Sequence, residues 1–266
     1  MANPYIIRVA SQKGGVGKTT IATNLAVTLS TLNYNVLIVD CDAANPSVGI
    51  HLGMVEANEG YKEVVEKKAK PSSVIVVHAP SGLKVLPGTI GGYSFTPEPA
   101  RFWEFVSELS KMKYDFIILD TSPGFSIREP TKYYSEALLI TTPEMSACTS
   151  VMRLAKLYTN DGLKHSLVIN RIRNKKYEYS VDEIEDMYEN RAIAAIPEDE
   201  AVPISVAQHI PTVMGFPKSE FSVGVKELGR RYSSRSDKVP LGPSKAMSQE
   251  RGGIFSSLRK AFGGKR

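Results

Sequence analysis

The run SQKGGVGKTT (residues 11–20) combines glycines, two lysines and two threonines in a spacing that suits phosphate chemistry. Glycines allow backbone N–H groups to approach phosphate oxygens, and a helix that starts here adds a favourable dipole. In this setting the Lys18 ammonium would neutralise β- and γ-phosphates, and the Thr19 hydroxyl would bind Mg²⁺. The usual G-x-x-x-x-G-K-[ST] loop has one lysine, whereas Gln12 replaces its first glycine here and Lys13 follows. The sequence therefore predicts a phosphate-binding loop with an additional lysine.

Three aspartates follow two apolar runs and would serve the same site. VLIVDCD places Asp40 and Asp42 at the end of one predicted strand, and FIILDTSPG places Asp120 at the end of another. Parallel sheets bind ligands at the carboxyl ends of their strands, where a carboxylate can hold Mg²⁺ directly or through water. An acidic residue at a strand end can instead cap the next helix. Together with a phosphate loop, the three favour a metal–nucleotide site.

These side chains need a scaffold in which strands and helices alternate. Short β-branched or apolar runs predict strands at residues 5–10, 36–40, 116–120, 137–142 and 166–170, with a weaker one at 192–197. Helical spacing of apolar residues predicts helices at 19–32, 99–112, 145–158 and 181–190. Residues 70–97 are rich in Pro and Gly and predict loops around one or two edge strands. The fold class predicted is α/β, with a doubly wound, mostly parallel central sheet of about seven or eight strands flanked by helices.

Composition sets further limits. The 266 residues are 42% hydrophobic and 23% charged, as in ordinary globular proteins, and two cysteines cannot build a disulfide framework or a thiolate metal site. No apolar run reaches 18 residues, and the first residues show no signal-peptide pattern, so a cytoplasmic protein is predicted. The four histidines lack ligand spacing and are predicted to be structural or surface residues: His51, His78, His165 and His209.

The charge is distributed unevenly along the chain. Residues 230–266 hold ten of the 33 Lys/Arg and two of the 28 Asp/Glu, so this end carries +8 and the remainder −3. We predict a globular domain over residues 1–232, a flexible polar linker over 233–253 and an amphipathic helix over 254–266. Apolar side chains of the last segment fall within an arc of about 120° on a helical wheel. With Arg259 beside this stripe and Lys260 away from it, the segment predicts a membrane-binding helix through the following residues: Ile254, Phe255, Leu258, Arg259, Lys260 and Phe262. A helix docked on the protein's own core is the alternative.

The runs KGGVGKTT, VDCD and DTSPG together resemble the deviant Walker A ATPases, the MinD/ParA group in the SIMIBI class of P-loop NTPases. The resemblance covers roughly residues 4–232. It implies that Lys13 reaches across a dimer interface to the partner's ATP. It also implies that Asp40 supports the Mg²⁺ site, that Asp42 positions the attacking water, and that residues 42–53 and 120–128 are the segments that sense the γ-phosphate.

The resemblance gives each site residue an expected role, with ATP and Mg²⁺ as cofactors. The VINRIR and IPEDEAV runs look like the family's adenine-recognition segments. The expected catalytic residues are Lys13, Lys18 and Asp42. The expected metal-site residues are Thr19, Asp40 and Asp120. The expected nucleotide-binding residues are Lys13, Gly14, Gly15, Val16, Gly17, Lys18, Thr19, Thr20, Asn170, Arg171, Pro197 and Asp199.

The predicted helix at residues 254–266 and the additional lysine, Lys13, favour a MinD-like function. The resemblance implies an ATP-dependent homodimer that attaches to an anionic lipid membrane through the tail, leaves on hydrolysis, and positions a division or surface apparatus with a protein activator or cargo. A ParA-like ATPase that binds DNA is one alternative, although the −3 balance of the body argues against specific DNA binding. An Mrp-like iron–sulfur carrier is another, since Pro46 and Ser47 match that family, but the chain lacks its C-x-x-C. A metabolic ligase or kinase such as dethiobiotin synthetase would need neither Lys13 nor the tail.

Overall fold

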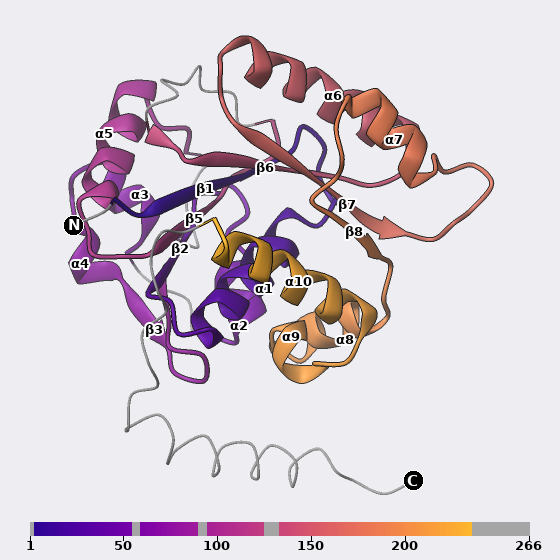
Figure 1. The fold of residues 1–266 in the computed structure, drawn as a ribbon. Coiled ribbons are helices and arrows are strands. Elements are labelled where there is room, and N and C mark those ends of the chain that lie inside the picture. The colour runs from indigo at the N-terminus through magenta and orange to yellow at the C-terminus, as the bar shows by residue number, and fades with distance from the viewer. Residues whose placement is uncertain (1–2, 55–58, 90–94, 125–132, 236–266) are drawn as a thin grey trace, which may run out of the picture.

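β-Branched and apolar runs form one eight-stranded sheet at the centre of the molecule (Figure 1). The structure is a computed structural model that describes residues 3–54, 59–89, 95–124 and 133–235. The strands are β1 (Tyr5–Ala10), β2 (Val36–Asp40), β3 (Val76–His78), β4 (Leu83–Leu86), β5 (Phe116–Asp120), β6 (Glu136–Thr141), β7 (His165–Ile172) and β8 (Ala194–Pro197). Their order is β3-β4-β2-β5-β1-β6-β7-β8, and every neighbouring pair is parallel except the β3–β4 pair.

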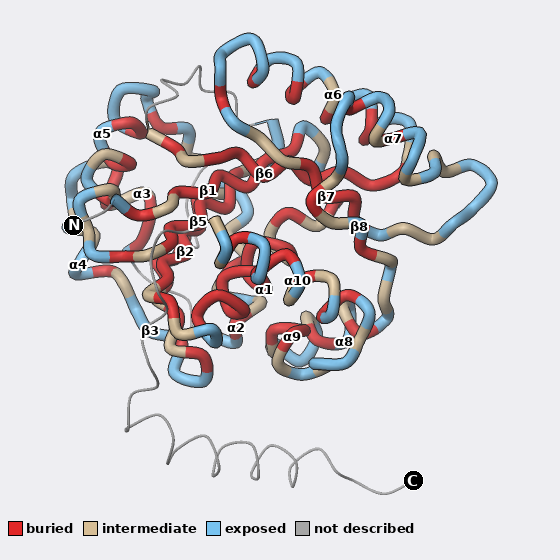
Figure 2. The backbone as a smooth tube through the Cα atoms, viewed as in Figure 1, coloured by how far each residue is buried: buried red, intermediate tan, exposed pale blue. Residues whose placement is uncertain are grey.

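Helices cover both faces of this sheet, because alternate side chains of each strand point to opposite faces. The helices are α1 (Lys18–Thr31), α2 (Val48–Leu52), α3 (Tyr61–Val65), α4 (Pro71–Val74), α5 (Pro99–Ser110), α6 (Met145–Asn160), α7 (Val181–Tyr188), α8 (Ala201–Ala207), α9 (Thr212–Gly215) and α10 (Glu220–Ser233). In β5, Ile117 and Leu119 join the core under α3, α5, α6 and α7, whereas Phe116 and Ile118 join the core under α1, α2, α9 and α10. Figure 2 shows the buried strands between the two half-exposed layers.

The predicted doubly wound, mostly parallel fold is confirmed, and each predicted strand and helix is present within a few residues of its expected bounds. Two details differ. The Pro- and Gly-rich region contains an antiparallel hairpin in which β3 is the edge strand, while β4 lies inside the sheet between β3 and β2. Helix α10 was not among the predicted helices, although Phe221, Val225, Leu228 and Tyr232 recur at helical spacing and are all buried.

The strand order places the phosphate loop at the point where the winding of the sheet reverses. β1 lies between β5 and β6, and the chain builds β2 to β5 on one side of it and β6 to β8 on the other. Ligands of open α/β sheets bind at the carboxyl ends of strands beside such a point. The run after β1 therefore lies beside the aspartates that end β2 and β5, which are register partners in the sheet (Asp40 and Asp120).

Some predicted segments fall on residues that the structure does not describe. The predicted linker beyond residue 235 and the predicted membrane helix, residues 254–266, lie outside the described residues, as do residues 125–128 of the predicted second γ-phosphate-sensing segment. Among the helices in the described ranges, none has both the length and the apolar character needed to cross a bilayer.

Candidate nucleotide-binding site

The loop between β1 and α1 has the backbone shape of an anion cradle. Gly15 and Gly17 have φ angles of 77° and 93°, in the left-handed region that glycine adopts most readily. Gly17 is also the N-cap residue of α1, so no side chain on it covers the first free N–H groups of the helix. A Cβ on Gly17 would lie 2.4 Å from Nδ2 of Asn170, so any other residue here would have to displace that amide. The loop therefore presents N–H groups at a helix start, where phosphate binds.

Lys18 begins α1 and lies against the carboxylates of the site. Its side chain is buried, and burial lowers the pKa of the ammonium, while the nearby carboxylates of Asp120 and Asp42 act in the opposite direction. The Asp42 carboxylate is half-buried and accepts a hydrogen bond from the Asn45 backbone amide at 3.1 Å. Lys18 in the first turn of α1 and the carboxylates that follow β2 and β5 thus lie in one small region.

The fit of a divalent cation can be tested on Asp40 and Asp120. Both are about 1% exposed, and burial raises the pKa of each; the Asp120 carboxylate adds to the rise at Asp40, and Asp42 makes a smaller addition at Asp120. Neither Asp120 oxygen has a hydrogen-bond donor at ordinary distance within the described part of the chain, although the Thr19 hydroxyl and Lys18 lie near enough to lower its pKa. Two buried carboxylates beside a hydroxyl are oxygen donors of the kind that Mg²⁺ prefers, so these residues fit that ion.

The additional lysine points away from its own loop. Lys13 Nζ donates to Ser146 Oγ at 2.6 Å and to Glu144 Oε2 at 3.3 Å, at the start of α6, and the Lys13 side chain is 41% exposed. These contacts place the Lys13 ammonium on the outer face of the site, separate from the buried Lys18. The two lysines of the loop therefore occupy different positions and are available for different contacts.

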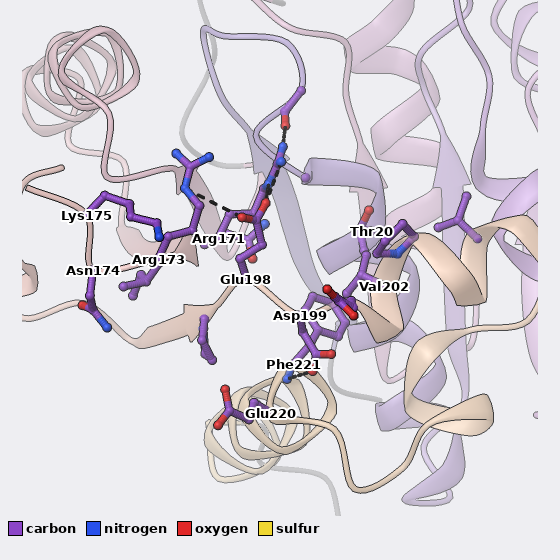
Figure 3. A pocket seen from close by; sticks show the side chains of 18 of the residues that line it. Thr20, Arg171, Arg173, Asn174, Lys175, Glu198, Asp199, Val202, Glu220 and Phe221 are labelled. Atoms are coloured by element: carbon purple, nitrogen blue, oxygen red, sulfur yellow. Dashed lines mark hydrogen bonds and ion pairs between the residues drawn. The ribbon is translucent and has the colours of Figure 1, made fainter. Parts of the chain in front are cut away.

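A pocket of about 1020 Å³ opens beside the loop, between β7, β8, α8 and α10 (Figure 3). Asn170 lies at its inner wall and donates from Nδ2 to the Val16 carbonyl at 2.9 Å. Arg171 has a φ of 58° at a break in the β7–β8 register, and this bulge directs its guanidinium to the Gly15 carbonyl (3.2 Å) and to Glu198 (2.8 Å). The predicted adenine-side residues thus reach the back of the phosphate loop.

The remaining predicted residues also line this pocket. Thr20 and Pro197 contribute to the wall, and Figure 3 shows Thr20 on the side opposite the loop after β7. Asp199 lines the pocket, but its carboxylate already accepts hydrogen bonds from the backbone amides of Ala201 (2.8 Å) and Phe221 (3.0 Å). Asp199 therefore holds the starts of α8 and α10 in place at the pocket wall.

Several site residues were not predicted from the sequence. Glu144 binds Lys13 and also Arg173 (3.0 Å), and Arg173 approaches Glu198 (3.7 Å), so ion pairs connect the additional lysine with the pocket. The sequence spacing of Glu144, Arg173 and Glu198 does not predict these contacts, because the three residues lie in separate loops, between β6 and α6, after β7 and after β8. His51, predicted to be structural or at the surface, lines the pocket with its Nε2 3.4 Å from the Thr20 hydroxyl. No group of three or more His, Cys, Asp or Glu in the described ranges has the arrangement of a metal cluster.

Comparison with known proteins agrees with this geometry. The sequence matches the family described as AAA domain over residues 5–166. It is 32% identical over 248 residues to the septum site-determining protein MinD of Thermotoga maritima, covering 89% of this chain and 90% of that protein. The structure resembles that of MinD complexed with Mg-ADP from Pyrococcus horikoshii, with a TM-score of 0.79 and 28% identity over 87% of this chain and 97% of the other. The cell division ATPase MinD of Pyrococcus furiosus gives a TM-score of 0.77 at 26% identity, over 87% and 99%.

A phosphate loop at the winding reversal of a doubly wound sheet, followed by carboxylates on the two neighbouring strands, defines a P-loop NTPase. Within that class, the matches over most of the chain and the KGGVGKTT run are decisive. The chain belongs to the MinD/ParA family of P-loop ATPases.

Proposed function

We propose that this protein is a Mg²⁺-dependent ATPase that forms a homodimer on binding ATP, attaches to an anionic membrane through residues 254–266, and leaves the membrane after hydrolysis. The role would be to position a division or surface apparatus, with a protein activator or cargo. Residues 1–232 would form the ATPase domain and residues 233–253 a linker. The observation that carries the proposal is Lys13, whose half-exposed ammonium is held at the outer face by Glu144 and Ser146 rather than beside its own loop.

The position of Lys13 supports a role toward a second molecule. Its partners Glu144 and Ser146 are themselves half-exposed or exposed, and exposed ion pairs contribute only about 0.2–1 kcal/mol. A triphosphate presented by another subunit offers more negative charge than one carboxylate, so Lys13 can exchange partners at small cost. Lys13 would then supply positive charge to the nucleotide of the other subunit, while Lys18 binds the nucleotide of its own subunit.

The residues of the site divide the work of hydrolysis among them. Phosphoryl transfer to water depends on positioning and on stabilisation of charge. Bound Mg²⁺ would neutralise phosphate charge, and Thr19, Asp40 and Asp120 would hold it. Lys18 would bind the β- and γ-phosphates, and Asp42, which is half-buried at the end of β2, would orient the attacking water. Gly14 to Gly17 would bind phosphate through backbone N–H groups, with Thr20 beside them.

The base would enter the pocket next to the loop. Asn170, Arg171, Pro197 and Asp199 come from the adjoining ends of β7 and β8 and lie along one wall. The structure of the relative from Pyrococcus horikoshii was determined with Mg-ADP, which supports nucleotide and metal as ligands here. Another relative, from Aquifex aeolicus, was solved as a MinC:MinD cell division protein complex, and it shares the fold at 23% identity.

Dimerisation can be tested by the molar mass of the protein with Mg²⁺ and ATP, together with hydrolysis rates. Asp42→Ala should retain ATP and remain dimeric because the attacking water is no longer oriented, whereas the exposed Asp161→Ala should behave as the wild type. Lys13→Ala should lower dimerisation and hydrolysis more than ATP affinity, with the exposed Lys156→Ala as its control. Normal hydrolysis by Asp42→Ala would refute its role, and loss of ATP binding by folded Lys13→Ala would refute action in trans.

Membrane attachment is tested by pelleting with liposomes that contain anionic lipid, with and without ATP. The full chain should pellet with ATP, because two weakly binding helices on one dimer act together. A chain ending at residue 253 should remain in solution under the same conditions. Equal pelleting of both forms would refute the membrane role, and ATP-dependent DNA retardation by the shortened form would favour the ParA-like alternative instead.

A further inference from the structure

The short helix α2 lies on the start of α1 through two side chains that are one helical turn apart. Ser47 Oγ donates to the Thr19 hydroxyl at 3.3 Å, and His51 Nε2 lies 3.4 Å from the Thr20 hydroxyl. The consecutive threonines of the phosphate loop thus each have a partner at the other segment. The segment that follows the second aspartate of VDCD is therefore attached to the loop at Thr19 and Thr20, the residues proposed to meet the metal and the phosphates.

The Ser47 hydroxyl bonds to the phosphate loop and not to the amides of its own helix. A serine at an N-cap normally accepts a hydrogen bond from the helix's own first amides. Ser47 is the N-cap residue of α2 but makes no such side-chain bond. Asp40 Oδ2 accepts the amides of Ser47 (2.8 Å) and Val48 (2.9 Å), which precede the amides that an N-cap side chain would bind, and His51 Nδ1 lies 2.9 Å from the Ser47 carbonyl. The backbone of Ser47 is fixed on both sides, and its hydroxyl is available to the site.

The spacing of the two hydroxyls suits one metal ion. Mg²⁺ binds oxygen ligands at about 2.0–2.1 Å in an octahedron, so neighbouring ligand oxygens lie about 3 Å apart. The Ser47 and Thr19 oxygens are 3.3 Å apart. Asp120 lies near Thr19 and Lys18 and is about 1% exposed, and neither of its carboxylate oxygens has a hydrogen bond of ordinary length to the residues that the structure describes. A buried carboxylate without such a donor points to a water or a cation bound at the same place, and this observation is independent of Ser47.

We propose that Ser47 is a direct ligand of the Mg²⁺ ion, next to Thr19. This inference rests on the proposed function, since the ion is the one that accompanies the nucleotide. Binding of the metal–nucleotide pair then fastens α2 to the phosphate loop through a metal bond that replaces the Ser47–Thr19 hydrogen bond. Ser47 thereby connects metal occupancy with the position of residues 42–53, which contain Asp42.

The test measures ADP binding against metal concentration, so that no hydrolysis enters the readout. Ser47→Ala should raise the Mg²⁺ concentration for half-maximal ADP binding about tenfold or more, as for loss of a metal ligand or its support. Ser47→Thr, which retains a hydroxyl, should stay near the wild type. In Ser47→Cys, Mg²⁺ should bind weakly while the thiophilic ion Cd²⁺ restores binding, because a thiolate prefers soft metals. Ser72→Cys, on an exposed position, controls for a new thiol elsewhere.

The outcomes separate the inference from the proposed function. If the wild type binds ADP with metal dependence but folded Ser47→Ala needs no more Mg²⁺, Ser47 is not a ligand and only its hydrogen bond to Thr19 remains. If Ser47→Cys loses affinity for Mg²⁺ and Cd²⁺ equally, the serine acts through packing alone, and the inference is again overturned. If the wild type binds ADP without any effect of metal, the proposed Mg²⁺-dependent function fails first. Circular dichroism and urea unfolding of each variant exclude a failure to fold.

Discussion

The close approach of Gly17 to Asn170 gives the sharpest prediction about the phosphate loop. Alanine at position 17 must adopt a φ of 93°, which costs a non-glycine residue roughly 1–2 kcal/mol. Its Cβ would also lie 2.4 Å from Asn170 Nδ2 and displace that amide from the Val16 carbonyl, which adds about 1–3 kcal/mol for a buried hydrogen bond. We expect Gly17→Ala to lower the free energy of unfolding by about 2–5 kcal/mol.

A second glycine separates the two contributions. Gly15 has a similar φ of 77°, but apart from Gly15 and its two chain neighbours no atom of the described residues lies within 4 Å of the position of its Cβ. Gly15→Ala should therefore cost the backbone term alone, about 1–2 kcal/mol. Urea unfolding of the nucleotide-free protein measures both variants on one scale. Equal costs for Gly15→Ala and Gly17→Ala would contradict the steric argument.

A double-mutant cycle tests the contact itself. Asn170→Ala removes the hydrogen bond to Val16 and should cost about 1–3 kcal/mol. Because Gly17→Ala already breaks that bond, the double variant should be about as stable as Gly17→Ala alone. The expected coupling is about 1–3 kcal/mol, whereas independent sites add within about 0.3–0.5 kcal/mol. If the two losses in the free energy of unfolding simply add, Asn170 does not shape the loop. In that case the losses of ATP affinity in the two single variants should also add.

Two further predictions concern stability. Burial lowers the pKa of His78 to about 4. As the pH falls below about 6.5, His78 is protonated in the unfolded chain but stays neutral in the folded chain, which favours unfolding. The free energy of unfolding should therefore fall by about 2 kcal/mol between pH 7.5 and pH 5 through this group. His78→Asn should reduce that pH dependence in urea unfolding by the same amount, and an unchanged difference between the two pH values would contradict the argument. Glu136 is fully buried and accepts a hydrogen bond from Arg235 at 2.7 Å, so Glu136→Gln should lower the free energy of unfolding by about 3–5 kcal/mol. Glu227 pairs with Arg231 at the exposed surface, so Glu227→Gln should lower it by less than about 1 kcal/mol. Thermal or urea unfolding compares the two, and similar costs would refute the importance of burial.

The nature of the site could be predicted because its main parts are local in the sequence. A strand that runs into KGGVGKTT and opens a helix fixes a phosphate loop within about twenty residues, and the backbone chemistry of glycine, lysine and threonine is the same wherever that unit lies. The apolar runs that end in Asp40 and Asp120 predict parallel strands, and their carboxyl ends lie at one edge of the sheet because parallel strands share one direction. That these two strands are direct neighbours is set by the strand order of the fold. For these residues the local pattern and the tertiary structure agree.

Residues that act through distant neighbours could not be predicted in this way. Lys13 meets Glu144 across 131 positions, and Arg171 reaches the loop only because a bulge in β7 gives it a positive φ. The sequence shows Ser47 and His51 one helical turn apart, but not that this turn packs on the consecutive threonines. The antiparallel β3–β4 hairpin is likewise set by where its short strands pair rather than by their composition.

The sequence alone therefore determined the chemistry and the order of the elements, because covalent neighbours set backbone propensity and apolar periodicity. The tertiary structure alone decided which side chains share the site, because hydrogen bonds and ion pairs depend on distances of about 3 Å that only the packed sheet and helices establish. The two lysines show the difference: the sequence placed both in one loop, and the fold buried Lys18 beside Asp120 while it left Lys13 at the outer face.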